Sequence, residues 1–471
     1  MITSASNTSD REILYAIALF GFAFIVFIFS LRSLIDANPI VADGYQNLSV
    51  ARNIINHTIF SSTEIDGATP TSDMQREPAW PFLTALFIYI LSLDHPTAVL
   101  AAEFSFYFKY FNLSLYSLAA SVASSFVYLK SRKVILSLLV LVLFLLVYGT
   151  TPRLINNFNN EALATLFLLV ASILFYVSIL NKNRGGIISI VLGLVLGVLA
   201  LTKAQYLYIC FPLALVLLFV NRRNSVLAIS AFAVVVSPWI FRNYELFNEP
   251  AIAKRGKTVL AVRIILTSEP SSEERLCMAY AFTHPSLQHY IEKTLGINNN
   301  DFIRGRKCQR LNRETCFDMG TVKVRCSAFP EDQYTSDYSS KIQLFYKGFH
   351  AGQQIEEGNL RFADLFLSSP DFFMKYITTF PLFVWRGMGF SDYPLVAVML
   401  TISTFALLFT RYWSFSLLCV SSFLFHVSIT HNIPRYQATL FPIMIISFVF
   451  LIYLAITRDQ SLLDVERTAQ L

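Results

Sequence analysis

Residues 134–152 read VILSLLVLVLFLLVYGTTP, an apolar run without Asp, Glu, Lys or Arg. A helix needs about 20 mostly apolar residues to cross a hydrocarbon core roughly 30 Å thick, and this run meets that requirement. The runs of this kind cover residues 13–31, 110–129, 134–152, 162–181, 185–202, 204–221, 224–241, 393–410, 413–434 and 436–457. One such run could be a buried helix of a soluble protein. Together they predict an all-α polytopic membrane bundle.

The composition agrees with lipid as the solvent of most of the chain. Of 471 residues, 55% are hydrophobic and 14% are charged, against roughly 25% charged in an average soluble domain. Two shorter apolar stretches, 79–93 and 372–385, could each cross the membrane, re-enter it or lie along its surface, so we expect about ten to twelve spans. No small-residue cleavage site follows the first run, which is therefore expected to stay as an anchor.

Short basic loops indicate which side of the membrane each end of a span faces. Lys and Arg gather in 130–133, 182–184 and 222–223, and single arginines follow at 411 and 458. All of these fall on one side if the spans alternate, and basic loops stay in the cytoplasm. Both termini are then cytoplasmic, the remaining loops face outward, and residues 79–109 cross twice or not at all.

We divide the chain into three parts. Residues 1–241 form an N-terminal transmembrane module with an outward loop at 32–81. Residues 242–371 form an extracytoplasmic insert of mixed or α-rich structure, and 372–471 hold the C-terminal transmembrane helices and a short cytoplasmic tail. The insert carries four of the six cysteines, Cys277, Cys308, Cys316 and Cys326. An oxidising compartment suits up to two disulfides among them, with three pairings open and free thiols as the alternative.

Charged residues gather at the predicted outward ends of the spans. Asp43 lies in the first outward loop, which leads to ARN at 51–53 and ends in REPAWP at 76–81. Further along the chain come NEAL at 160–163, LTK at 201–203, PWIFRNY at 238–244 and PRY at 434–436. Apart from Arg52 in ARN, the charged members of these motifs are Asp43, Arg76, Glu77, Glu161, Lys203, Arg242 and Arg435, and Tyr436 follows the last of them.

These motifs and their order resemble the GT-C superfamily of membrane glycosyltransferases, in particular the protein-mannosyltransferase and aminoarabinose-transferase-like group. The likeness covers most of residues 12–457 apart from the insert. In one departure, Asp43 is followed by Gly44 rather than by a second acid. The resemblance implies a GT-C-like bundle and an inverting transfer of a sugar from a polyprenyl-phosphate donor to a lipid, glycan or protein acceptor outside the cytoplasm. It also implies a bacterial inner membrane, with the active site facing the periplasm or the cell exterior.

The proposed chemistry explains the residue types. A carboxylate can take the proton of an acceptor hydroxyl, and Asp43 is the candidate for this catalytic role. Positive side chains can hold the departing phosphate, with Arg favoured where two oxygens are gripped at once. The candidate donor-phosphate or substrate-binding residues are Arg76, Glu77, Glu161, Lys203, Arg242, Arg435 and Tyr436.

Each candidate also has a purely structural interpretation. Asp43 could cap the helix that starts near Tyr45, the cations could anchor helix ends at the membrane interface, and Glu161 could interact with a helix dipole. Glu103 and Lys109, in apolar surroundings, are candidates for a substrate path. No histidine or cysteine spacing predicts a metal, no cofactor is assigned, and a role for a divalent cation stays open.

Two other functions fit the same composition. An O-antigen polymerase or ligase also has many spans and one large external loop, but relies on arginines in that loop. A transporter or channel would place its binding site near the middle of the membrane, and the lack of internal repeats argues against it. A nucleic-acid partner is not expected for an outward-facing domain.

Overall fold

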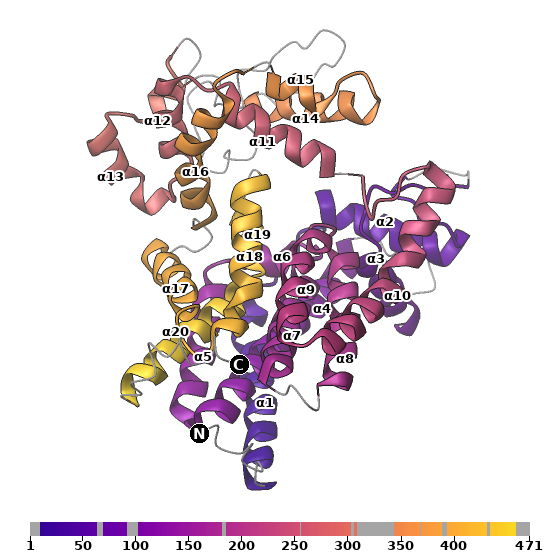
Figure 1. Ribbon diagram of the computed structural model, residues 1–471, viewed down its shortest axis with the longest axis vertical. Coiled ribbons are helices and arrows are strands. Elements are labelled where there is room, and N and C mark those ends of the chain that lie inside the picture. Colours follow the sequence, from indigo (N-terminus) through magenta and orange to yellow (C-terminus); the bar gives the residue numbers. More distant parts are fainter. Residues whose placement is uncertain are drawn as a thin grey trace. The chain divides into compact units, whose positions relative to one another are not determined.

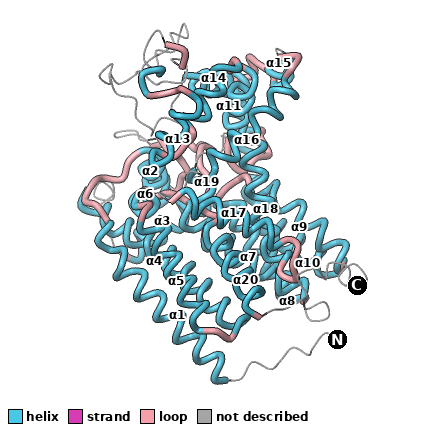
Figure 2. The backbone as a smooth tube through the Cα atoms, turned by 90° about the vertical axis from the view of Figure 1, so that its left-hand side faces the viewer, coloured by secondary structure: helices cyan, strands magenta, loops and turns pink. Residues whose placement is uncertain are grey.

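The computed structural model describes residues 10–63, 69–91, 102–180, 185–254, 256–302, 306–308, 343–367, 369–388, 393–430 and 434–457. Every regular element within these ranges is a helix (Figure 2). The all-α prediction is therefore confirmed for the described part of the chain. Cys316, Cys326 and Arg458 lie outside it.

The helices of the first half are α1 (Asp10–Leu31), η1 (Arg32–Leu34), α2 (Ala42–His57), α3 (Ala79–Ile90), α4 (Ala102–Ser131), α5 (Val134–Gly149), α6 (Pro152–Asn156), α7 (Glu161–Leu180), α8 (Gly186–Thr202), α9 (Tyr206–Val220) and α10 (Arg222–Phe247). Those of the second half are α11 (Gly256–Ser268), α12 (Ser272–Ala281), α13 (Pro285–Leu295), η3 (Asn299–Phe302), α14 (Gln343–Glu356), α15 (Phe362–Leu367), α16 (Phe372–Met388), α17 (Pro394–Leu407), α18 (Trp413–Ile429), α19 (Pro434–Ala438) and α20 (Phe441–Ile456).

Among the residues that the structure describes, four stretches of helix are long and apolar enough to cross a membrane: Asp10–Leu34, Phe104–Ser131, Glu161–Leu180 and Arg222–Phe247. Seven further apolar helices, α3, α5, α8, α9, α17, α18 and α20, have 17 residues or fewer. The run at 134–152 shows why some are shorter than the sequence suggested. Its helix α5 ends at Gly149, and Pro152, which cannot donate a backbone hydrogen bond, opens the separate helix α6.

The chain forms two compact units. Unit 1 comprises residues 1–254, 399–422 and 438–471, and unit 2 comprises 255–398 and 423–437. The boundary that the sequence placed at 242 falls inside α10, which continues to Phe247.

Unit 1 is a bundle in which α4 contacts α1, α5 and α7, α7 contacts α8, and α8 contacts α10 (Figure 1). Helix α20 packs on α4, α5 and α7. The tightest approach joins α8 to α10. A Cβ atom built on Gly193 would lie 2.1 Å from the carbonyl oxygen of Ala228, so only glycine fits there. Such small residues let membrane helices approach closely.

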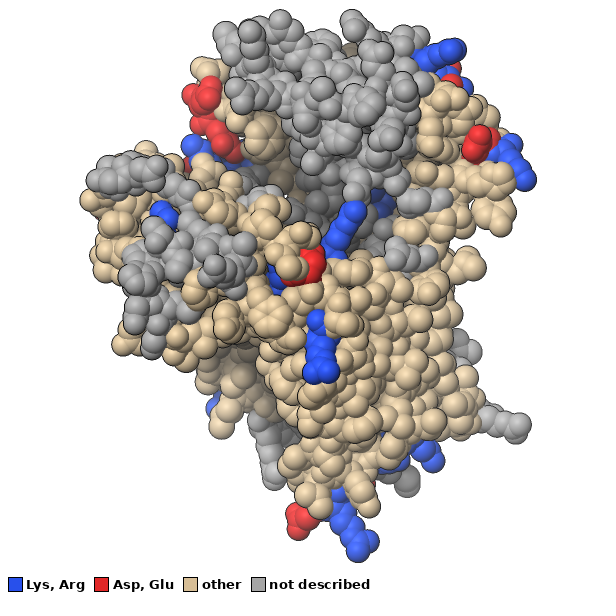
Figure 3. Space-filling model, turned by 180° about the vertical axis from the view of Figure 1, so that it is seen from behind, with Lys and Arg blue, Asp and Glu red and all other residues tan. Residues whose placement is uncertain are grey.

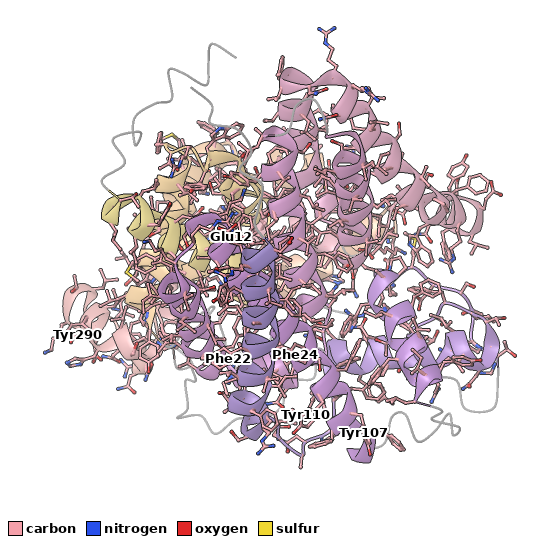
Figure 4. All side chains as sticks on the ribbon, turned by 90° about the horizontal axis from the view of Figure 1, so that it is seen from below. Glu12, Phe22, Phe24, Tyr107, Tyr110 and Tyr290 are labelled. Carbon is pink, nitrogen blue, oxygen red and sulfur yellow. A yellow bond between two sulfur atoms is a disulfide. The ribbon has the colours of Figure 1, made fainter. Side chains whose placement is uncertain are left out.

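The outer surface of unit 1 is apolar. On α1, Ala16, Ala23 and Phe27 are buried against the bundle, whereas Ile17 and Phe22 are exposed. Figure 4 shows Phe22 on the outside of α1, and Figure 3 shows a broad face of the molecule with few charged side chains. Contiguous exposed apolar surface of this kind is what a helix presents to lipid.

Unit 2 is built around the pair α11 and α14. Gly348 and Gly352 of α14 face the backbone of Val262 and Thr258 on α11, where an added Cβ would lie 2.5 Å from either Cα atom. Helix α16 packs on α11 and α12. A disulfide joins Cys277 of α12 to Cys308, so one of the predicted pairings is present.

Candidate functional site

Asp43 lies in the first turn of α2 and forms an ion pair with Arg76. One terminal nitrogen of Arg76 lies 2.6 Å from Oδ1 of Asp43 and also donates to the side-chain oxygen of Gln46, one turn further along α2. The Asp43 side chain is 24% exposed, whereas that of Arg76 is 6% exposed. The carboxylate is therefore accessible and is held from its buried side by the guanidinium.

Backbone packing explains why this turn has no larger residue beside the acid. Val41, in an extended conformation, precedes the helix, and Gly44 follows Asp43. A Cβ atom on Gly44 would lie 3.0 Å from the carbonyl oxygen of Phe158. The glycine that departs from the GT-C pattern thus allows α2 to pack against the segment that leads into α7.

Arg242 is held by the same loop that carries Arg76. It lies near the end of α10 and donates to the carbonyl oxygen of Asp73 at 3.2 Å and to the side-chain oxygen of Asn243 at 2.7 Å. Its guanidinium carbon lies 4.6 Å from the ring centre of Trp239 and 5.5 Å from that of Phe60. Aromatic contacts of this kind stabilise a cation.

The carboxylate of Asp73 shapes the loop itself. It accepts hydrogen bonds from both the backbone and the hydroxyl of Ser62, at 2.6 Å each. The backbone of Met74 in turn accepts from Lys254. Residues 73–76 therefore connect α10, through Arg242, to α2, through Asp43.

A second ion pair joins Glu161, the first residue of α7, to Lys203, which follows α8. Their Oε1 and Nζ atoms are 3.1 Å apart, and the side chains are 7% and 6% exposed. The neighbouring Asn160 donates to the carbonyl oxygen of Thr202 at 2.6 Å. An ion pair and a hydrogen bond therefore join the start of α7 to the end of α8.

Aromatic packing places the two ion pairs in one region of unit 1. The ring of Trp80, at the start of α3, lies 4.8 Å from that of Phe158, which precedes Glu161 by three residues. Glu77 is partly exposed in the two-residue link between Arg76 and α3. Contacts among short segments of unit 1 therefore link five of the predicted charged residues: Asp43, Arg76, Glu161, Lys203 and Arg242.

The remaining two candidates are in unit 2. Arg435 is the second residue of α19, and its side chain lies outside the described part of the structure. The ring of Tyr436 stacks on that of His426, with the ring centres 5.2 Å apart. A pocket that these two residues share with Asp43 stays a prediction.

Sequence reasoning missed the partner of Lys109. This lysine of α4 donates to the carboxylate of Asp36 and to the carbonyl oxygens of Asp36 and Asn38. Asn156 of α6 donates to the carbonyl oxygen of Leu34 at 2.8 Å. These contacts fix the loop that enters α2, and the substrate path at Lys109 stays a prediction. The side chain of Glu103 lies outside the described residues.

The arrangement supplies an accessible carboxylate that is paired with one buried cation, Arg76. Within the ranges that the structure describes, no group of three or more His, Cys, Asp and Glu side chains could hold a metal ion. An ionised Asp43 carboxylate beside the Arg76 guanidinium could accept a proton. Comparison with protein families, curated proteins and solved structures gave no match.

Proposed function

We propose that the protein is an inverting membrane glycosyltransferase that takes its sugar from a polyprenyl-phosphate donor. The observation that carries the proposal is the Asp43–Arg76 pair, an accessible carboxylate held by a buried guanidinium in the first turn of α2. Glu161, Lys203 and Arg242 lie on segments packed against the same loop. An apolar bundle suits a polyprenyl tail, and a cluster of charged groups at its end suits the reacting sugar phosphate.

In the proposed reaction, Asp43 accepts the proton of the acceptor hydroxyl as that oxygen attacks the anomeric carbon. The bond from this carbon to the phosphate oxygen breaks, and the polyprenyl phosphate leaves with the electron pair. Attack from the face opposite the leaving group inverts the anomeric centre, as in inverting hydrolysis. Arg76 orients Asp43 through their ion pair. In this proposal the cations at 203, 242 and 435 offset the charge on the phosphate.

We place this reaction on the extracytoplasmic face of a bacterial inner membrane, with ten to twelve crossings and cytoplasmic termini. The positions of two ion pairs support this orientation. Arg132 pairs with Glu12 at 2.8 Å, where α4 ends and α1 begins. Lys109 pairs with Asp36 towards the opposite ends of the same two helices. The disulfide Cys277–Cys308 supports an oxidising compartment for unit 2.

The test is an assay of the purified protein with a panel of polyprenyl-phosphate sugars, scoring consumption of each donor. We expect turnover with at least one donor and a loss of about 100- to 10,000-fold in Asp43→Asn, the range that general-base catalysis contributes. The matched control is Asp364→Asn, because Asp364 also pairs with an arginine, Arg361, but on an exposed surface.

The control variant should keep wild-type turnover. Full activity in Asp43→Asn, with the variant folded, would remove the general base and favour a polymerase or ligase that relies on loop arginines. Substrate flux through proteoliposomes without donor consumption would instead identify a transporter.

A further inference from the structure

Helix α16 of unit 2 leaves one apolar face uncovered. Phe373 and Met374, near its start, are 71% and 63% exposed, and Ile377, one turn further on, is 48% exposed. Pro381, another turn along, is exposed as well. Residues at these spacings share one face of an α-helix. The exposed side of α16 therefore carries apolar side chains over about three turns.

The opposite side of α16 is already used by the core of unit 2. Thr379 and Phe383 are buried there, and the helix packs on α11 and α12. The ring centre of Phe383 lies 5.7 Å from that of Phe282, which follows α12. A helix at a water-facing surface carries polar residues on the side away from its core. Helix α16 is apolar on both sides, which is not the pattern of a helix that faces water.

Helix α16 is joined to one end of the apolar helix α18. The hydroxyl of Tyr376 donates to the carbonyl oxygen of Ser428, in the last turn of α18, at 3.2 Å. The next residue, Ile429, is 40% exposed. In the chain, residues 389–393 alone separate α16 from the apolar helix α17, a link of about 20 Å when fully extended. The uncovered face is therefore held close to segments that we assign to the membrane.

The charge that borders this face is compensated within unit 2. Lys375 pairs with Asp371, one turn before it, at 3.0 Å. The same ammonium group donates to the carbonyl oxygen of Ser268, at the end of α11, at 3.0 Å. Attraction to an anionic partner is therefore not the main force at this surface. Apolar burial is what the face offers.

We propose that Phe373, Met374, Ile377 and Pro381 form a lipid-contacting face that holds unit 2 against the bilayer. A helix of this kind buries its apolar side at the boundary between headgroups and acyl chains. A phospholipid surface fits the face in three respects: it takes up apolar side chains, it requires no net charge, and it surrounds the membrane helices to which α16 is joined. Exposed apolar patches mark such contact surfaces.

This inference does not rest on the transferase reaction. The face belongs to unit 2, whereas Asp43, Arg76, Glu161 and Lys203 belong to unit 1. A membrane protein of another function would use the same face in the same way. Lipid contact is measured without a sugar donor, so the two proposals can fail separately.

The experiment places the photoreactive residue p-benzoylphenylalanine at position 373 of the full-length protein in phosphatidylcholine vesicles. After illumination, mass spectrometry measures the fraction of the labelled peptide that carries a phospholipid. The matched control has the same residue at Tyr290 of α13, a side chain of unit 2 that is 65% exposed beside the exposed Glu292 and Lys293. We expect at least about tenfold more lipid adduct at position 373, because only that face meets the bilayer.

A second variant tests the face without changing the probe. Ile377→Glu should lower lipid capture at position 373 by about tenfold, because a carboxylate one turn away keeps this part of the helix in water. Tyr290→Glu is its control and should leave that capture unchanged. Both side chains are exposed, so neither substitution removes a core contact.

Three results would overturn the proposal. Cross-links from position 373 to another peptide of the same chain, in place of lipid adducts, would show that the protein itself covers the face. A product of doubled mass would show that a second copy covers it. Equal lipid capture at positions 373 and 290 would show that α16 has no particular contact with the bilayer.

Discussion

At the scale of single residues, the ion pairs Asp43–Arg76 and Glu161–Lys203 differ in what they can do. Asp43 and Arg76 form a pair with one accessible member, so a substrate can approach the carboxylate. Glu161 and Lys203 are both enclosed, and their contact joins the start of α7 to the end of α8. We therefore expect the general base from the first pair, and from the second a cation that is held in place at the joined helix ends.

Replacing Lys203 with Met should destabilise the protein by about 3–5 kcal/mol, because the carboxylate of Glu161 would stay buried without its counter-charge. The double variant with Glu161→Gln should recover most of that loss. Chemical denaturation of the purified protein measures both changes. Equal losses in the single and double variants would show that the two side chains are not coupled.

Lys109→Met should make stability less dependent on pH. Burial raises the pKa of Asp36, but the hydrogen bond and charge of Lys109 and the backbone N–H of Asn38 outweigh it, so the pKa lies below its usual value. The stabilisation is full above about pH 4, where the unfolded carboxyl ionises, and is lost as the pH falls through the lower folded value.

The unfolding temperatures of wild type and Lys109→Met should accordingly differ at pH 6 and converge towards pH 3. A constant difference across that range would show that Lys109 acts through the two carbonyl oxygens alone.

The residues of the site could be predicted from the sequence, but their partners could not. Asp43, Arg76, Glu161 and Lys203 were all candidates, yet the Asp43–Arg76 and Glu161–Lys203 contacts depend on how separate helix ends meet. Lys109 illustrates the difficulty, because its partner Asp36 is 73 positions away in the chain. Periodicity within one helix carries no information about such a contact.

At the scale of elements, glycine decides how closely α8 and α10 pack. The Cβ position of Gly193 is occupied by the backbone of Ala228, and that of Gly197 by the side chain of Val235. Gly21 of α1, by contrast, has no atom within 4 Å of its Cβ position. The two kinds of glycine are indistinguishable in the sequence.

Gly193→Ala should therefore destabilise the protein by about 1–3 kcal/mol through overpacking. Gly21→Ala, as its matched control, should be neutral or stabilise the helix by up to about 1 kcal/mol. Thermal unfolding of both variants makes the comparison. Equal behaviour of the two would mean that α8 and α10 are not in close contact.

The apolar runs in the sequence predicted where helices lie far better than they predicted where those helices end. The sequence left open whether residues 79–109 cross the membrane twice or not at all. Helix α3 has 12 residues and is about 18 Å long, so it is too short to cross alone. Its rings pack on the first half of α4, where Phe87 lies 4.3 Å from Phe111 between ring centres. Composition cannot distinguish such a half-length helix from a span, because both are apolar.

At the scale of the whole molecule, different groups of charged residues lie at the two ends of helix α4 in unit 1. The basic turn at 131–133 lies at one end of α4, and Lys109 and Asp36 lie towards the other. Cysteines introduced at Ala37 and Lys133, both exposed positions, should react with a membrane-impermeant maleimide from opposite sides of sealed vesicles. Labelling of both from the same side would contradict the proposed orientation.

If unit 2 folds in the proposed oxidising compartment, the bond between Cys277 and Cys308 makes correct insertion of the chain measurable. A chain whose second unit stayed in a reducing compartment would carry two extra thiols, so its mass after alkylation would report which way it had been inserted. Maturation of this protein would then require a thiol oxidase as well as the insertion machinery. Strains lacking such an oxidase should accumulate a shorter-lived form.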